Sequence, residues 1–406
     1  MPTGTVLYDD SMDLSNVYAV VLAGGQSSRL FPFNKVLSDL TGSGRSLLQQ
    51  AYDRATRRFI SREHFFVLTD QAAVPAMRKQ LRLAQRHFYV DPQRRGTWPA
   101  LMWAMAHLRR QDPAATLAVL PGDQVMPNSR EFRQVASRAI QIAQDEPAVV
   151  LLGTTPSKNP STWLGFGCFK AERGCITAFR EKPSLEDARR MTRERGWYWN
   201  SGMFFFRLST AEAALRHYQP AMWDIYERMA QAIARRHESQ ASRLYAFFPA
   251  SIPYLLNPAR RVDNTIDYAL LTPMAFEPFE GARPCALTGV LSGWSDLGEW
   301  KTLRTLMKPD RRGNIRLGKV YADSHTRDCI LAADAGCHVD ARGLRGLVVA
   351  FSSPRSLIIP ESEVGRVKSF VSARQGNMVT TGLKRLKIIL RGRRLSVVSS
   401  EHGFIR

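Results

Sequence analysis

The sequence is poor in the features that mark membrane, secreted and metal-stabilised proteins. It contains no run of 18 apolar residues, so no membrane-spanning helix is expected. No lysine or arginine precedes Arg29, whereas a secretory signal needs a basic start followed by an apolar stretch. The five cysteines are an odd number without CxxC spacing, which argues against a disulfide framework and against a zinc site. Reduced thiols and the missing signal together predict a cytoplasmic protein.

Acidic residues are also scarce, because 36 aspartates and glutamates stand against 57 lysines and arginines, a net charge of +21. Such a charge can attract nucleic acid, anionic lipid or phosphorylated small molecules. Most of the arginines are scattered along the chain, which is typical of solvated helix faces, so no specific nucleic acid partner is expected. The exception is a cluster of six basic residues between Lys384 and Arg394. Its alternation with apolar residues fits an edge strand, a membrane-surface contact or a poorly ordered tail.

With 406 residues, 44% of them hydrophobic, the chain is long enough for two or three globular domains. Apolar runs predict buried strands at residues 17–23, 65–69, 116–120 and 149–152. Segments with helical periodicity lie between them, at about residues 46–59, 72–85, 98–109 and 131–144. This alternation predicts a doubly wound α/β fold with a mixed, mostly parallel sheet. In such sheets ligands bind beyond the carboxyl ends of the strands.

The pattern changes after about residue 310, where short apolar segments are separated by glycine or aspartate turns. This predicts a small β-rich domain, for which a short β-solenoid is one arrangement that fits. The predicted parts are an N-terminal extension at 1–16, an α/β domain at 17–310, the β-rich domain at 311–375 and a basic tail at 376–406.

The first candidate site is a glycine loop at the end of the first predicted strand. Gly24 and Gly25 would let backbone N–H groups approach a phosphate closely. The loop matches neither the GxGxxG pattern nor a P-loop, so a plain strand-to-helix turn is the alternative interpretation. Arg29 and Lys35 favour a triphosphate, because a guanidinium and an ammonium follow the glycines closely.

The second candidate is a pair of carboxylates from distant segments. Asp123 follows the strand at 116–120, where a lone aspartate is more often a turn or cap residue. Asp296 lies in an aromatic, glycine-framed segment at 293–300. Two converging carboxylates can hold Mg²⁺, which usually takes one or two of them together with substrate phosphates.

Further segments add groups that can bind hydroxyls and phosphates, and the whole set resembles the sugar-1-phosphate nucleotidyltransferases, most of all the mannose-1-phosphate guanylyltransferases. The motifs are Gly-Gly-x-x-x-Arg-Leu from Gly24, Gly-Asp at 122–123, Phe-x-Glu-Lys-Pro from Phe179, Trp-Asn-Ser-Gly from Trp199, Ile-Asp-Tyr-Ala from Ile266 and Trp-Ser-Asp-Leu-Gly from Trp294. The resemblance covers about residues 17–310 and, more faintly, 313–360. Each motif alone is weak, but six in order are specific.

The resemblance implies transfer of a nucleoside monophosphate, from GTP above all, to a sugar 1-phosphate, above all mannose 1-phosphate, with GDP-mannose and pyrophosphate as products. The implied nucleotide-binding residues are Leu22, Ala23, Gly24, Gly25, Thr97 and Gly122. The implied catalytic residues are Arg29, Lys35, Asp123, Lys182 and Asp296, of which Asp123 and Asp296 would hold Mg²⁺. The implied sugar-phosphate-binding residues are Gly165, Glu181, Lys182 and Asn200. Asp267 matches a motif position and receives no role. Since a sugar phosphate is already an anionic nucleophile, catalysis would rest on positioning and charge stabilisation.

Three departures from the family pattern keep alternatives open. Residues 31–35 form a shortened segment, Gly96-Thr97-Trp98-Pro99 stands where Asn-Thr-Ala-Pro is common, and Gln124 stands where histidine is common. One alternative is the same reaction with another base or sugar, such as glucose 1-phosphate. Another is a catalytically silent homologue that binds nucleotide sugar in a regulatory role. A third alternative, which rests on the net charge of +21 and the basic tail and not on these departures, is a nucleic-acid or membrane-surface binder. A homodimer is compatible with the sequence.

Overall fold

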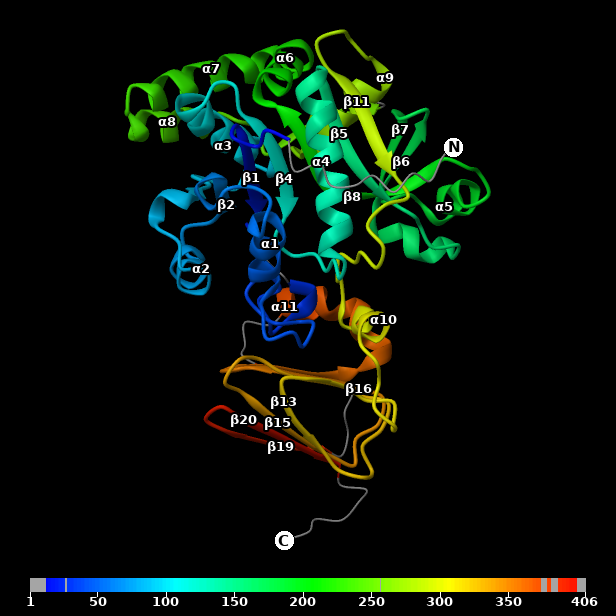
Figure 1. Cartoon of the computed structure of the whole chain (residues 1–406). Helices are drawn as coiled ribbons and strands as arrows, with labels where there is room; N and C mark the ends of the chain where they lie inside the picture. The colour runs from blue at the N-terminus through cyan, green and yellow to red at the C-terminus, as the bar shows by residue number, and fades with distance from the viewer. Residues whose placement is uncertain (1–11, 26–27, 256, 374–377, 381–385, 400–406) are drawn as a thin grey trace. The chain divides into compact units, whose positions relative to one another are not determined.

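The computed structural model describes residues 12–25, 28–255, 257–373, 378–380 and 386–399 (Figure 1). The chain divides into two compact units. The α/β unit comprises the residues up to Gly24 together with Ala51–Pro121 and Met126–Trp294. The β-rich unit comprises Gly25–Gln50, Gly122–Val125 and the residues from Ser295 onwards.

The α/β unit is built on a nine-stranded sheet with the strand order β3-β2-β1-β4-β8-β5-β11-β7-β6. Its strands are β1 (Val17–Leu22), β2 (Phe65–Thr69), β3 (Phe88–Val90), β4 (Thr116–Pro121), β5 (Ala148–Thr154), β6 (Gly167–Glu172), β7 (Cys175–Glu181), β8 (Trp197–Arg207) and β11 (Arg283–Thr288). Strands β7 and β8 run against the other seven. The predicted mixed α/β fold is therefore confirmed.

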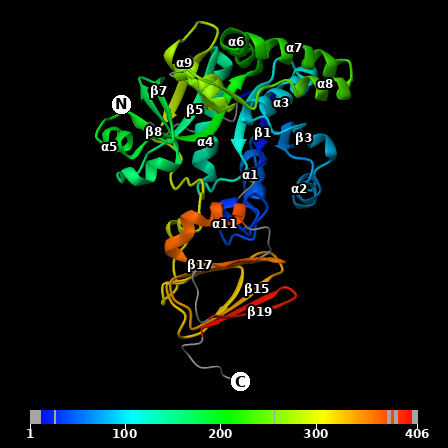
Figure 2. The ribbon, with the colours of Figure 1, turned by 180° about the vertical axis from the view of Figure 1, so that it is seen from behind.

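Helices cover the sheet where strands such as β1, β2, β4 and β5 are buried on both faces. The helices of the α/β unit are α2 (Val74–Leu81), α3 (Thr97–Gln111), α4 (Ser129–Asp145), α5 (Leu185–Met191), α6 (Leu208–Tyr218), α7 (Pro220–Ala234), α8 (Glu238–Tyr245) and α9 (Thr272–Phe276), and α1 (Leu47–Thr56) runs across the boundary between the units. Helices α3, α6, α7 and α8 share one core with alternate residues of the sheet, such as Val20, Phe66 and Leu117. Figure 2 shows α7 and α8 beside α3. Helix α4 contributes none of its buried residues to that core and packs on β4, β5 and β8.

The four strands predicted in the first half of the chain are all present, with ends that differ by at most two residues. The antiparallel direction of β8 was not predicted, and neither was the three-residue strand β3. Helices α6, α7 and α8 were also not assigned from the sequence. A two-stranded antiparallel sheet of β9 (Ser251–Tyr254) and β10 (Asn257–Asp263) completes the strands described in this unit.

The β-rich unit contains two sheets, with the strand orders β12-β14-β16-β17-β18 and β13-β15-β20-β19. Its strands are β12 (Ile315–Leu317), β13 (Lys319–Ala322), β14 (Ile330–Ala333), β15 (His338–Arg342), β16 (Leu347–Ser352), β17 (Arg355–Pro360), β18 (Met378–Thr380), β19 (Leu386–Arg391) and β20 (Arg394–Ser399). It also holds the helices α10 (Leu303–Leu306) and α11 (Val367–Ala373). Most neighbours are parallel, and β16–β17 and β19–β20 are antiparallel.

The basic cluster near the C-terminus forms strand structure where it is described. Lys387 and Arg391 lie in β19, the edge strand of its sheet, whereas Lys384 and Arg385 lie outside the described residues. This corresponds to the edge-strand interpretation of the cluster. All five cysteines are free thiols. Among the described residues, no helix is long and apolar enough to cross a membrane.

The β-rich unit also includes segments from before residue 310. The segment at 25–50 and residues 295–310 pack with the β-rich strands, because Leu30, Phe31 and Phe33 share a buried core with Trp300 and Ile315.

Candidate active site

The β-rich unit brings together two cations and two carboxylates: Arg29, Lys35, Asp123 and Asp296, here called the cation–carboxylate group. The Lys35 ammonium lies 2.6 Å from the Asp123 carboxylate. Asp296 is close enough to Arg29, Lys35 and Asp123 to interact electrostatically with all three. The shortened segment at 31–35 therefore does not keep Lys35 away from Asp123.

A short backbone bridge draws the two carboxylates together. Val125 and Ser295 exchange both N–H to carbonyl hydrogen bonds, at 2.9 and 3.0 Å. Asp123 lies two residues before one partner, and Asp296 directly follows the other. Because the bridge fixes both backbones, two carboxylates that are 173 positions apart in the sequence enter the same site.

The segment that carries Arg29 and Lys35 is anchored on Trp300. The indole of Trp300 is fully buried and donates a hydrogen bond of 3.2 Å to the carbonyl of Phe31. The ring of Phe33 meets the same indole edge-on, with 5.3 Å between the ring centroids. Arg29 is in a short 3₁₀ turn, Ser28–Leu30, at the start of this segment. The aromatic, glycine-framed segment at 293–300 thus supplies both a carboxylate and the support for the cations.

Burial raises the pKa of the Asp296 carboxyl, and Asp123 raises it further, whereas Lys35 and Arg29 lower it. A carboxylate that is costly to ionise in this environment gains from an additional cation. Among the described residues, no cluster of three or more histidine, cysteine or acidic side chains could enclose a metal. Two carboxylates nevertheless fit Mg²⁺, because this ion keeps several waters and takes other ligands from phosphates.

The α/β unit holds a second group around the end of β7, formed by Glu181, Lys182 and Asn200. The Lys182 ammonium lies 3.0 Å from the Glu181 carboxylate. A Cβ atom added at Gly167 would lie 2.5 Å from Glu181 Oε2 and 3.5 Å from the Cβ of Asn200, so the two side chains flank this glycine closely. The backbone N–H of Lys182 donates to the carbonyl of Phe166 at 3.1 Å, next to Gly165. The predicted sugar-phosphate-binding residues therefore lie in or beside the backbone at 165–167; they are Gly165, Glu181, Lys182 and Asn200.

Asp267, the motif residue that received no role from the sequence, belongs to this second group. Its Oδ1 accepts a hydrogen bond of 2.7 Å from the side-chain amide of Asn200. Burial raises the pKa of Asp267 to about 7, and the neighbouring Glu181 carboxylate contributes to the increase. Asn200 and Lys182 act in the opposite direction. Asp267 therefore loses its proton close to neutral pH.

A pocket of about 220 Å³ lies in the α/β unit at the carboxyl ends of β1, β2 and β3, which is here called the strand-end pocket. Three predicted nucleotide-binding residues, Leu22, Gly24 and Thr97, line it. Ala23 does not line it, and its carbonyl accepts a hydrogen bond of 3.3 Å from Thr69. Gly25 and Gly122 belong to the β-rich unit.

Sequence reasoning missed three charged residues of the strand-end pocket: Asp70, Asp91 and Arg94. Arg94 forms an ion pair of 3.4 Å with Asp70. Burial raises the pKa of Asp91. Asp70 follows β2 and Asp91 follows β3, so both carboxylates stand at strand ends, where ligands of such sheets bind. The signal for Asp91 was lost because the short strand β3 was not predicted.

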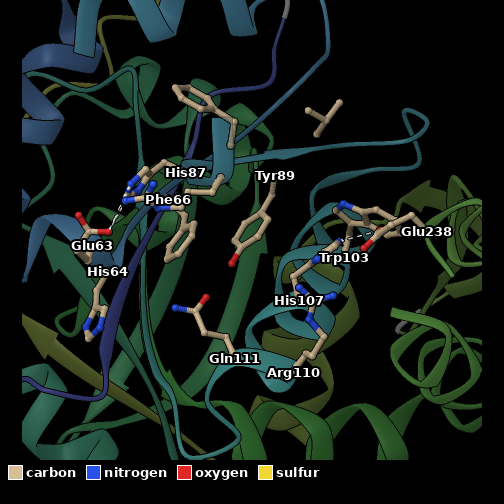
Figure 3. Close-up of a pocket in the computed structure, with 13 residues that line it drawn as sticks. Glu63, His64, Phe66, His87, Tyr89, Trp103, His107, Arg110, Gln111 and Glu238 are labelled. Atoms are coloured by element: carbon tan, nitrogen blue, oxygen red, sulfur yellow. Dashed lines mark hydrogen bonds and ion pairs between the residues drawn. The ribbon is translucent and has the colours of Figure 1, made fainter. Parts of the chain in front are cut away.

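A second pocket, of about 640 Å³, lies in the α/β unit where β2 and β3 begin and α3 ends (Figure 3). It contains none of the predicted site residues. Phe66, Tyr89 and Trp103 give it aromatic walls. Burial lowers the pKa of His107 to about 4, assisted by Arg110, so this imidazole is neutral at pH 7. The pocket is larger than the strand-end pocket and lies at the opposite ends of β2 and β3.

The chain matches the nucleotidyl transferase family over residues 18–312. The alginate biosynthesis protein AlgA of Pseudomonas aeruginosa is 29% identical to it over 87% of this chain and 71% of that protein. A mannose-1-phosphate guanylyltransferase of Salmonella montevideo is 29% identical over 87% of this chain and 72% of that protein. The enzyme of the same name from Escherichia coli is 27% identical, over 89% and 74%. A solved structure described as mannose-1-phosphate geranyltransferase from Thermus thermophilus superposes with a TM-score of 0.70 at 24% identity, covering 88% of this chain and 99% of that one. This last likeness shows a shared fold.

Proposed function

The chain belongs to the nucleotidyl transferase family, and from this premise we propose that it transfers GMP from GTP to mannose 1-phosphate, giving GDP-mannose and pyrophosphate. The single observation that carries the proposal is the cation–carboxylate group, in which Lys35 lies 2.6 Å from Asp123 and Asp296 interacts with both. The mannose-1-phosphate guanylyltransferases among the relatives support the choice of sugar and base.

In the proposed reaction a phosphate oxygen of the sugar 1-phosphate attacks the α-phosphorus of GTP, and pyrophosphate leaves with the bonding electrons. Arg29 and Lys35 neutralise the β- and γ-phosphates, where negative charge accumulates as the bond breaks. Asp123 and Asp296 would hold Mg²⁺, which when bound supplies charge neutralisation at the reacting phosphates. No residue needs to act as a general base, because the attacking phosphate is already anionic.

The second group serves the sugar phosphate in this proposal. Glu181 and Asn200 hydrogen-bond the sugar hydroxyls, and the Lys182 ammonium binds the phosphate. Gly167 allows Glu181 to approach the backbone closely, because a Cβ atom there would lie 2.5 Å from Glu181 Oε2. Each role follows from the chemistry of the side chain together with its place in the family motif.

The strand-end pocket supports guanine as the base. The Watson–Crick edge of guanine presents N–H donors, and carboxylates are strong acceptors for such groups. Asp70 and Asp91 supply two carboxylates to this pocket, and Arg94 partly neutralises the first of them. A pocket with these acceptors discriminates against bases that present acceptors at the same place, because buried unpaired acceptors are costly.

The decisive experiment measures pyrophosphate release with Mg²⁺ for GTP, ATP, UTP, CTP and dTTP, each against mannose 1-phosphate and glucose 1-phosphate. We expect GTP with mannose 1-phosphate to give the highest kcat/KM. A strong preference for another pair would keep the reaction and replace the substrates. Absence of turnover with every pair, in folded protein that binds nucleotide, would overturn the proposal in favour of a regulatory homologue.

We further infer that the β-rich unit is a short β-solenoid, an arrangement supported by its parallel pairs β12–β14–β16 and β13–β15–β20. The homodimer, the cytoplasmic location and the domain limits at residues 16, 310 and 375 stay predictions.

A further inference from the structure

The side-chain amide of Asn200 is held from both ends. Its Oδ1 accepts a hydrogen bond of 2.7 Å from the backbone N–H of Gly202. Its Nδ2 donates a hydrogen bond, also of 2.7 Å, to Oδ1 of Asp267. Because an N–H must meet the oxygen and a carboxyl oxygen must meet the nitrogen, the amide has only one orientation that satisfies both partners. Within the described part of the chain these are its side-chain partners, which leaves one N–H and one oxygen lone pair of Asn200 for a ligand.

Asp267 is the partner that comes from a distant segment, and the local backbone gives it a fixed position. It begins a π-helical turn, Asp267–Leu271, and such turns are frequent at functional sites. Its own carbonyl accepts a hydrogen bond of 2.9 Å from the hydroxyl of Thr272. The turn is followed directly by α9. The Asp267 carboxyl is therefore presented to Asn200 by a hydrogen-bonded helical turn.

The charged and titratable groups around Asp267 come from several elements. Glu181 and Lys182, from the end of β7, act on its carboxyl from one side. Tyr268 follows it in its own turn and is itself influenced by Glu181, Arg260 and Tyr254. An ionised Asp267 would place a second negative charge beside Glu181, with Lys182 as the neighbouring cation. A dianionic sugar phosphate would then meet one more negative charge.

We propose that Asp267 is a positioning residue of the sugar-phosphate subsite, whose carboxyl oxygen fixes the orientation of the Asn200 amide. This inference rests on the proposed function of Glu181, Lys182 and Asn200, and it adds a role for a residue that contacts the substrate through Asn200. The ionisation of Asp267 then weakens sugar-phosphate binding without removing any group that contacts the nucleotide.

The expected pH dependence follows from the fraction of protein in the competent, protonated form. With a pKa of about 7, nearly all Asp267 is protonated at pH 6 and only about one tenth at pH 8. Since apparent affinity falls in proportion to the competent fraction, the KM for mannose 1-phosphate should rise about tenfold between these pH values. The substrate phosphate has its own second pKa of about 6, and this ionisation affects every variant alike.

The test compares the wild type with Asp267→Asn and Asp267→Ala. Asp267→Asn keeps an oxygen that accepts from Asn200 but cannot ionise, so its KM should lose the tenfold rise. Asp267→Ala removes the hydrogen bond, so its KM should be raised at both pH values while the KM for GTP stays constant. Asp263→Asn, an exposed carboxylate four residues away, is the matched control and should retain the wild-type pH profile. Thermal melting of each variant verifies that it folds.

Calorimetric titration with mannose 1-phosphate alone separates this inference from the proposed function. If the protein turns over and the ratio of the wild-type KM to the Asp267→Asn KM is constant from pH 6 to pH 8, the role of Asp267 is overturned. The proposed function would remain intact. Binding that weakens with pH only in the wild type, without turnover, would support Asp267 and refute the enzyme. No binding and no turnover at any pH would overturn both.

Discussion

The raised pKa of Asp267 makes a prediction about stability that needs no substrate. The pKa of an aspartate is ordinarily 3.8, and in the folded protein the pKa of Asp267 rises to about 7. Between these values the folded α/β unit retains a proton that the unfolded chain has lost. Folding stability is therefore fully present at low pH and declines as the pH rises from about 4 to about 7. Asp267→Asn removes this decline, because an amide carries no charge at either pH.

The size of the effect follows from the pKa difference. Each pH unit over which only the unfolded chain is deprotonated costs about 1.4 kcal/mol. From pH 5 to a pKa of about 7 the cost is about 3 kcal/mol. The α/β unit has about 260 residues, for which the entropy of unfolding is about 0.5 kcal/mol per degree. The Tm of Asp267→Asn should thus gain about 5 °C on the wild type when the pH is raised from 5 to 8.

Differential scanning calorimetry at pH 5, 6, 7 and 8 measures this gain. The quantity to compare is the difference in Tm between the two proteins at each pH, because the ionisations of groups that do not interact with Asp267 cancel in this difference. Asp263→Asn again provides the control, and its Tm should follow that of the wild type. A Tm difference that is constant over the pH range would show that Asp267 ionises at its ordinary pKa, and the reasoning from its burial and from Glu181 would be refuted.

Three further predictions concern other side chains. Asp123→Asn should lower kcat at least about 100-fold with little change in Tm, because a metal-binding carboxylate contributes several kcal/mol to stabilisation of the transition state. Steady-state kinetics with Mg²⁺ measures this loss. A near-normal kcat would contradict a metal-binding role for Asp123. Lys182→Ala should raise the KM for mannose 1-phosphate about 10- to 100-fold, since a charge-assisted hydrogen bond contributes about 1.5–3 kcal/mol. An equal rise in the KM for GTP would argue against Lys182 as a residue that binds the sugar phosphate. Cys175 and Cys285 are direct partners on the antiparallel strands β7 and β11, so oxidised glutathione should convert the two thiols to one disulfide and release two reduced glutathiones. Peptide mass mapping would detect that cross-link, Cys175→Ser should prevent it, and recovery of both cysteines as free thiols would count against the pairing.

The strands of the sheet that could be predicted are those whose burial leaves a local signal in the sequence, namely a continuous run of apolar residues. Strands such as β1 and β5 are continuous apolar runs because both of their faces are covered, and such runs can be recognised without knowledge of their neighbours. Strand β8 begins instead with aromatic and polar residues, and the direction in which it runs depends on its partners β4 and β5. Strand β3 has only three residues, too few for any periodicity.

The same distinction applies to the candidate site. Asp123 and Asp296 could be paired from the sequence because each lies in a motif, but the backbone bridge between Val125 and Ser295 that joins them is a long-range contact. Asp91 could not be read as a strand-end residue while β3 was unassigned. Asp267 stood in a motif without a role, because the hydrogen bond that gives it one reaches Asn200, 67 positions earlier.

Gly96 shows how a departure from a family pattern can have a packing cause, and it yields a final prediction. Its φ of 109° and ψ of 169° belong to a region that is open essentially to glycine alone. A Cβ atom there would lie 2.1 Å from the backbone oxygen of Asn264, which also accepts the N–H of Trp98 at 3.2 Å. Restoring the common family residue with Gly96→Asn should therefore lower the Tm, with about 1–3 kcal/mol of backbone strain in addition to the clash. Gly174→Asn is the matched control, because Gly174 also has a positive φ and an added Cβ there would meet no atom of the described residues within 4 Å. Equal Tm values for the two variants would mean that contact with Asn264 does not explain the glycine at position 96. The departure from the family pattern would then again favour the catalytically silent homologue.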